Sequence, residues 1–154
     1  MSFESDLKRG RKGEEMFEKA MQVDGESATN VTGQEAYQGA DIDYVDSCGG
    51  GWEVKTDYML HRTGNLALES FTSTKGDSWL WTSKADIFVF AIPQTDEVYA
   101  IDAQLLRILC KEPACRRISK YDFGKEIELI LLPFDKYREA FVSLPMGVNE
   151  KKCA

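Results

Sequence analysis

Three charged residues, Asp43, Glu53 and Lys55, have the types and the spacing to bind a metal ion together. Segments with strand-like alternation flank a glycine-rich stretch at residues 47–51, and this pattern predicts a β-hairpin. With 47–51 as the loop, Asp43 lies opposite Lys55 and is a diagonal neighbour of Glu53, at roughly 7–8 Å. Neighbouring carboxylates repel each other unless a cation lies between them, and hard divalent cations prefer oxygen ligands. We therefore expect a metal ion at this face of the hairpin.

The order of these residues is similar to a known signature. Asp43, nine intervening residues and then Glu53-Val54-Lys55 resembles the PD-(D/E)xK motif of the restriction-endonuclease-like nuclease superfamily, although the proline is missing. The resemblance implies that Asp43 and Glu53 bind the metal ion and that Lys55 acts beside them in catalysis. Asp41 is the alternative to Asp43, because both residues have the same parity along the expected strand.

Residues 6–22 have the pattern of an amphipathic helix, with Gly13 on its apolar side and Glu14 at the border of that side. The apolar side consists of Leu7, Phe17, Ala20 and Met21. In the nuclease superfamily the first helix often supplies an acid to the metal site, and the run from Gly10 to Phe17 looks like the first helices of resolvase-type members. The resemblance therefore implies that Glu14 is a further metal ligand and catalytic residue, with Glu18 as its alternative.

Two later segments match the same relatives. Asn65 and Glu69 match a gN-x-x-x-E segment of phage and bacterial members, so Glu69 either lines the same site or is a plain surface acid. Residues 79–86 resemble a GW-(I/L)-x-x-S-x-A-D segment, in which a short helix leads into a core strand. We expect Trp79 and Trp81 to pack in the core, with base stacking as the alternative. Three lysines are expected to contact nucleic acid: Lys12, Lys75 and Lys84.

The 154 residues, of which 43% are hydrophobic and 29% charged, suit one soluble globular domain. We expect this domain to span residues 1–146 and residues 147–154 to be a disordered tail. No apolar run approaches the roughly 20 residues of a membrane span, and the N-terminus lacks the hydrophobic region of a signal peptide. We therefore expect a cytoplasmic protein that does not bind a membrane.

The net charge of −7 argues against nonspecific binding of nucleic acid over the whole surface. Positive charge is concentrated in two clusters, which are either local binding patches or solvated faces: Lys8, Arg9, Arg11 and Lys12, and Lys111, Arg116, Arg117 and Lys120. The four cysteines have no C-x-x-C spacing, and His61 is the single histidine. These features argue against a zinc site and favour free thiols.

The expected order of helices and strands predicts a mixed α/β (α+β) fold with one central mixed sheet flanked by helices. It suits the three-layer restriction-endonuclease-like fold, with residues 111–124 as a polar loop. The resemblance implies a Mg²⁺-dependent DNA endonuclease, with Mn²⁺ as a substitute metal and a phage as one source. The alternatives are an inactive module of the same fold that binds DNA or a protein, and an RNA-processing relative. Cleavage of both DNA strands would favour a homodimer.

Overall fold

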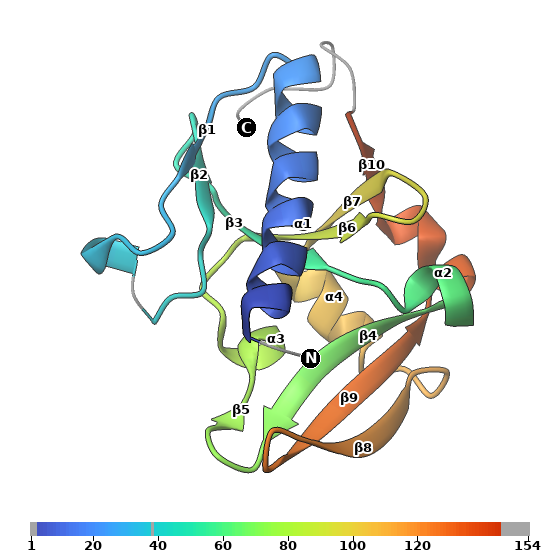
Figure 1. The fold of residues 1–154 in the computed structure, drawn as a ribbon. Coiled ribbons are helices and arrows are strands. Elements are labelled where there is room, and N and C mark those ends of the chain that lie inside the picture. The colour runs from blue at the N-terminus through green and yellow to red at the C-terminus, as the bar shows by residue number, and fades with distance from the viewer. Residues whose placement is uncertain (1–2, 38, 146–154) are drawn as a thin grey trace.

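The computed structural model describes residues 3–37 and 39–145, and Figure 1 shows their arrangement. The helices are α1 (Phe3–Val23), α2 (Leu60–Thr63), α3 (Trp79–Thr82), α4 (Ala103–Leu109) and α5 (Phe134–Tyr137), with short 3₁₀ helices at Glu35–Tyr37 and Arg138–Ala140. The strands are β1 (Ala28–Asn30), β2 (Tyr44–Asp46), β3 (Gly51–Thr56), β4 (Asn65–Thr72), β5 (Gly76–Asp77), β6 (Ile87–Ile92), β7 (Glu97–Asp102), β8 (Arg116–Asp122), β9 (Lys125–Pro133) and β10 (Val142–Leu144).

The strands form a six-stranded sheet in the order β1-β2-β3-β6-β7-β10 and a four-stranded sheet in the order β5-β4-β9-β8. In the six-stranded sheet β3 and β6 run parallel, and the other neighbours run antiparallel. This mixed central sheet with flanking helices confirms the expected α/β class. The sequence did not predict the second sheet, in which β4 and β9 pair with each other antiparallel.

Apolar side chains on both faces of the six-stranded sheet form the core. On one face, Phe17 of α1 is fully buried against the rings of Tyr44 and Trp52, at centroid distances of 4.8 and 5.5 Å. The other face packs on α3, α4 and the second sheet through a larger cluster that includes Phe88, Phe90, Ile101, Leu66, Ile130, Leu80 and Leu106. Figure 1 shows the resulting layers, with α1 in front of the six-stranded sheet and α4 behind it.

Gly13 allows α1 to pack closely on the end of β3. A Cβ atom on Gly13 would overlap the hydroxyl oxygen of Thr56 and would lie 3.1 Å from Thr56 Cβ and 3.4 Å from Ala91 Cβ. The overlap with the Thr56 hydroxyl is shorter than any contact a real Cβ atom makes, so a side chain at residue 13 would force Thr56 or the helix to shift. The close approach holds the part of α1 that carries Glu14 against the end of β3.

Gly13→Ala is expected to lower the free energy of unfolding by roughly 1–3 kcal/mol, because the added methyl group must displace Thr56 or lift α1 from the sheet. Urea unfolding measures this change. Gly10→Ala is the matched control, since a Cβ atom there meets no heavy atom within 4 Å. That control is expected to raise the free energy of unfolding by up to about 1 kcal/mol, as Ala is favoured over Gly inside a helix. Equal stabilisation by both substitutions would contradict the close packing.

Several local expectations are wrong. Residues 116–122, expected within a polar loop, form the edge strand β8, whose side chains are almost all exposed. Such a strand has no buried face and therefore no apolar alternation to detect.

Leu7 is 47% exposed and does not join the apolar side of α1. Cys48 is disulfide-bonded, so the expectation of free thiols fails there, whereas Cys110 and Cys115 are free.

Two expectations concern the ends of the chain and membranes. The tail expected at residues 147–154 lies outside the described residues. Within residues 3–37 and 39–145, none of the helices combines the length and apolarity that crossing a membrane requires.

Candidate active site

The hairpin that carries the site has a shorter turn than the sequence predicts. Tyr44 pairs with Trp52 and Val45 with Gly51, so Gly51 belongs to β3 and the expected register is wrong by two residues. The cause is the side chain of Asp46, which accepts hydrogen bonds from the backbone of Cys48 and Gly50 and, at 2.7 Å, from the Trp52 indole. These hydrogen bonds make the turn shorter than the expected loop of residues 47–51, because Gly51 already pairs with Val45.

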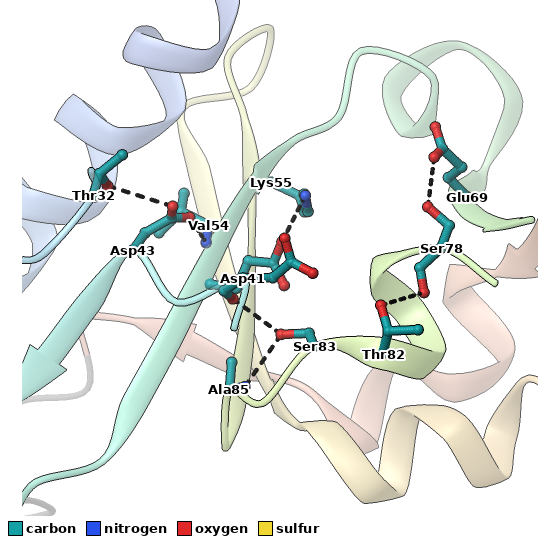
Figure 2. A network of polar contacts seen from close by, with 11 residues as sticks. Thr32, Asp41, Asp43, Val54, Lys55, Glu69, Ser78, Thr82, Ser83 and Ala85 are labelled. Carbon is teal, nitrogen blue, oxygen red and sulfur yellow. Dashed lines mark hydrogen bonds and ion pairs between the residues drawn. The ribbon is translucent and has the colours of Figure 1, made fainter. Parts of the chain in front are cut away.

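The new register places Asp43, one residue before β2, level with Glu53 rather than Lys55. Asp43 lies just outside β2, although its amide still donates a 2.8 Å hydrogen bond to the Trp52 carbonyl. Its carboxylate oxygen Oδ2 accepts a 2.8 Å hydrogen bond from the Val54 amide of β3. The Thr32 hydroxyl donates to Oδ1 at 3.5 Å. Burial raises the pKa of Asp43, while the Val54 amide and the charge of Lys55 act in the opposite direction. Figure 2 shows Asp43 between Thr32 and Val54.

Glu53 and Lys55 lie on the opposite face of β3 from α1, because Trp52 and Val54, which alternate with them, pack in the same cluster as α1. The Lys55 ammonium is 2.6 Å from Glu53 Oε1 and 4.7 Å from the centre of the Trp79 ring. Glu53 is 3% exposed, and its second oxygen, Oε2, has no hydrogen-bond partner among the described residues. Burial raises the pKa of Glu53 to about 6, although Lys55 and the nearby Ser83 hydroxyl act in the opposite direction. A buried carboxylate oxygen without a partner is costly in an isolated protein and suits a cation.

Glu14 of α1 lies close enough to Asp43 for the two charges to interact. Partial burial and the charge of Asp43 raise the pKa of Glu14, and the charge of Arg11 opposes this shift without cancelling it. Its sequence alternative, Glu18, accepts a 2.6 Å hydrogen bond from the Tyr44 hydroxyl. The fold thus brings Glu14 toward Asp43 and engages Glu18 with a core tyrosine.

Asp41 lies between the other acids, outside any strand. Its φ of 52° is in the left-handed region, which few residues other than glycine adopt. The charge of Asp41 raises the pKa of both Asp43 and Glu53. Asp41 therefore remains an alternative metal ligand, held by a loop rather than by the strand that the sequence predicts.

The other predicted site residues lie outside this acidic group. The carboxylate of Glu69 accepts a hydrogen bond from the Ser78 hydroxyl, and Figure 2 shows this pair apart from Asp41 and Lys55. The three predicted lysines are exposed. Lys12 lies on α1, Lys75 lies in the turn between β4 and β5, and Lys84 lies just before β6. Trp79 and Trp81 pack against the larger core cluster, as expected.

Sequence reasoning missed Asp57, a buried carboxylate just after β3. Its oxygens accept hydrogen bonds from the backbone of Met59, Leu60 and Ala67, at 2.7, 2.9 and 3.0 Å. Asp57 thereby starts α2 and ties β3 to β4, which fixes the end of the strand that carries Lys55. An Asp ahead of a short helix is a common cap, and this was the only available signal.

The donors present fit a hard cation that retains much of its water. Among the described residues, no group of three or more His, Cys, Asp or Glu side chains is placed to hold one ion. The expected convergence of three acids on a single point is therefore not formed. Mg²⁺, however, is commonly bound by one or two carboxylates, with waters and substrate phosphates completing its octahedron. The unpartnered oxygen of Glu53 and the neighbouring acids meet that requirement.

Comparisons with known proteins give little further guidance. No protein-family model matches the chain, and no curated protein matches it in sequence. Among solved structures, the bacterial homing endonuclease I-Ssp6803I has a TM-score of 0.45 and 16% sequence identity, over 63% of this chain and 68% of that protein. A likeness at this level assigns neither a family nor an activity to the chain.

Proposed function

We propose that the protein is a metal-dependent nuclease that hydrolyses DNA phosphodiester bonds with the Asp-Glu-x-Lys group around β3. The observation that carries this proposal is the buried, unpartnered oxygen of Glu53 beside Lys55. The charge of Asp41 acts on both Glu53 and Asp43, and the charge of Asp43 acts on Glu14, which links the four acids. Carboxylates of this kind are retained in a fold when a cation neutralises them.

In this proposal Glu53 and Asp43 hold Mg²⁺, or Mn²⁺ in its place, and Glu14 contributes through water. The ion would lower the pKa of a bound water and stabilise the charge that builds on the phosphate. Lys55 either orients that water or stands as a cation beside the phosphate. Its position over the Trp79 ring keeps the ammonium on the same face as the Glu53 carboxylate.

A basic pocket on the first half of α1, the helix that carries Glu14, offers the phosphate backbone a place to bind. The pocket has a volume of about 560 Å³ and lies between the first half of α1 and Tyr58, whose ring contacts the Arg9 guanidinium at 4.9 Å. The basic residues that line it are Lys8, Arg9, Arg11 and Lys12. Because the whole chain has a charge of −7, this concentration of cations supports approach of a polyanion from the side of Glu14.

The double substitution Lys8→Ala, Lys12→Ala is expected to weaken DNA binding similarly for all sequences. The slope of log K against log salt should fall by about one for each lost phosphate contact. Fluorescence anisotropy in Ca²⁺, across a series of salt concentrations, measures both quantities. The matched control is Lys19→Ala, Lys136→Ala, which removes the same charge from exposed positions outside the pocket. An equal loss in the control would show that only net charge matters.

One observation favours a second function, an inactive module that binds DNA or a protein. The ion pair between Lys55 and Glu53 already compensates one carboxylate oxygen, and no three-ligand group is preformed among the described residues. A protein that has lost its metal chemistry can keep such a pair.

Incubation with nucleic acid separates the two functions. Branched, single-stranded and duplex DNA, and RNA of the same sequences, are each incubated with Mg²⁺ or Mn²⁺ and then with a chelator. The nuclease proposal predicts cleavage of DNA that the chelator stops. Binding without cleavage under every condition would favour the inactive module, and cleavage of RNA alone would correct the substrate class.

A further inference from the structure

The loop that carries Asp41 is held by Ser83, a buried residue between α3 and β6. The Ser83 hydroxyl donates a 3.0 Å hydrogen bond to the Asp41 carbonyl and accepts one of 3.1 Å from the Ala85 amide. The next amide, that of Lys84, donates to the Ala40 carbonyl at 2.8 Å. These contacts, two of which are drawn in Figure 2, hold the backbone of Asp41 in its uncommon left-handed conformation.

The segment that contains Ser83 is itself held by Arg107 of α4. Arg107 Nε donates to the Leu80 carbonyl at 2.6 Å, and Nη2 donates to the Ser83 carbonyl at 2.9 Å. The last carbonyls of a helix lack partners within the helix, and a planar guanidinium can bind two acceptors at once. Arg107 therefore fixes the end of α3 with two hydrogen bonds from one rigid group.

Aromatic contacts link the same segment to Glu53 and Lys55. The Arg107 guanidinium lies 5.5 Å from the ring centre of Phe88, which is the partner of Glu53 in the parallel pairing of β3 with β6. The Trp79 ring stands edge-on to Phe88 at 5.3 Å, and its face lies under the Lys55 ammonium. Movement of α3 would thus disturb Asp41, Glu53 and Lys55 together.

We infer that Arg107 and Ser83 are positioning residues, which hold the Asp41 loop and the α3 segment so that the acids and Lys55 keep their relative places. We call the hydrogen bonds of Arg107 to Leu80 and Ser83, with that of Ser83 to Asp41, the Arg107 clamp. The inference rests on the proposed function only for its consequence, metal binding. The clamp itself consists of contacts that can be tested in the metal-free protein.

Hydrogen exchange of the metal-free protein tests the clamp. Arg107→Met keeps an apolar stem over Phe88 but removes the guanidinium, and Ser83→Ala removes the hydroxyl. Both are expected to speed exchange of the Lys84 amide by about tenfold, the effect of losing a supporting hydrogen bond. The control is Arg138→Met, because Arg138 contacts Tyr99 and Phe134 instead. Unchanged exchange of the Lys84 amide in Ser83→Ala overturns the inference. If Arg107→Met does not fold, the result for Ser83→Ala decides alone.

Binding of Mn²⁺, measured by isothermal titration calorimetry, tests the consequence. Loss of a residue that supports metal ligands typically weakens metal affinity by about 10–100-fold, and we expect this for Ser83→Ala and Arg107→Met. Arg107→Lys should recover part of the affinity, and DNA affinity without divalent ions should not change. Faster exchange with unaltered Mn²⁺ affinity would overturn the positioning role. A wild-type protein that binds no Mn²⁺ would overturn the proposed function, and hydrogen exchange alone would then decide on the clamp.

Discussion

Glu53→Gln is expected to reduce Mg²⁺-dependent DNA cleavage by about 10³-fold, because it removes a charged metal ligand from a site that works by electrostatic stabilisation. The same change should leave the protein at least as stable at pH 8. Glu53 is buried with one oxygen unpartnered, so its charge costs free energy that a neutral amide of the same shape avoids. Initial cleavage rates and thermal unfolding of the metal-free protein measure the two effects.

The pH dependence of stability tests whether the buried charge of Glu53 lowers the stability of the folded protein. The pKa of Glu53 is raised from its ordinary 4.5 to about 6, so the folded state binds this proton more tightly than the unfolded state does. The resulting stabilisation is complete below pH 4.5 and is lost as the pH rises through about 6. Wild type should therefore lose stability relative to Glu53→Gln between pH 5 and roughly pH 7. Retained cleavage by the variant, or a constant stability difference over this range, would contradict the assignment.

Lys55→Met is expected to lower cleavage by roughly 10²–10³-fold without weakening Mn²⁺ binding. The ammonium is lost from the reaction, but its removal also frees Glu53 Oε1, which it contacts at 2.6 Å. A methionine side chain can still pack on the Trp79 ring. Single-turnover cleavage and calorimetric Mn²⁺ titration separate the two outcomes, which differ from those of Glu53→Gln, where metal binding and cleavage should fall together.

Lys19→Met is the matched control for Lys55→Met, since it makes the same change at an exposed position on α1. It should alter neither measurement. If Lys55→Met cleaved DNA at the wild-type rate, Lys55 would be only a structural partner of Glu53, and the nuclease proposal would lose its general base or cationic group.

The parts of the fold that the sequence predicted are those with a strong local pattern. The apolar run Ile87–Ile92 is typical of a strand covered on both faces, and it forms β6, whose residues from Phe88 to Ile92 are all buried. The turn of the central hairpin could not be placed, because it depends on three bonds to the side chain of Asp46. The edge strand β8 was missed, because a strand exposed on both faces has the composition of a loop.

The candidate site was predictable only in part. The alternation Glu53-Val54-Lys55 requires two neighbouring charged side chains on one face of a strand, and they form an ion pair. The direction of Asp43 toward the Val54 amide depends on where β2 ends, which the period of the sequence does not determine. The roles of Ser83 and Arg107 follow from contacts between segments that are distant in the sequence, and no local pattern marks them.

Crystals of the protein grown or soaked with Mn²⁺ test most directly whether these acids form a metal site. An anomalous difference map at the manganese edge is expected to show an ion in contact with Glu53 Oε2, with a second oxygen from Asp43 or Asp41. The peak should vanish in Glu53→Gln. A fully occupied Mn²⁺ elsewhere, or none at saturating concentration with Lys55 still bound to Glu53, would contradict a metal-dependent nuclease.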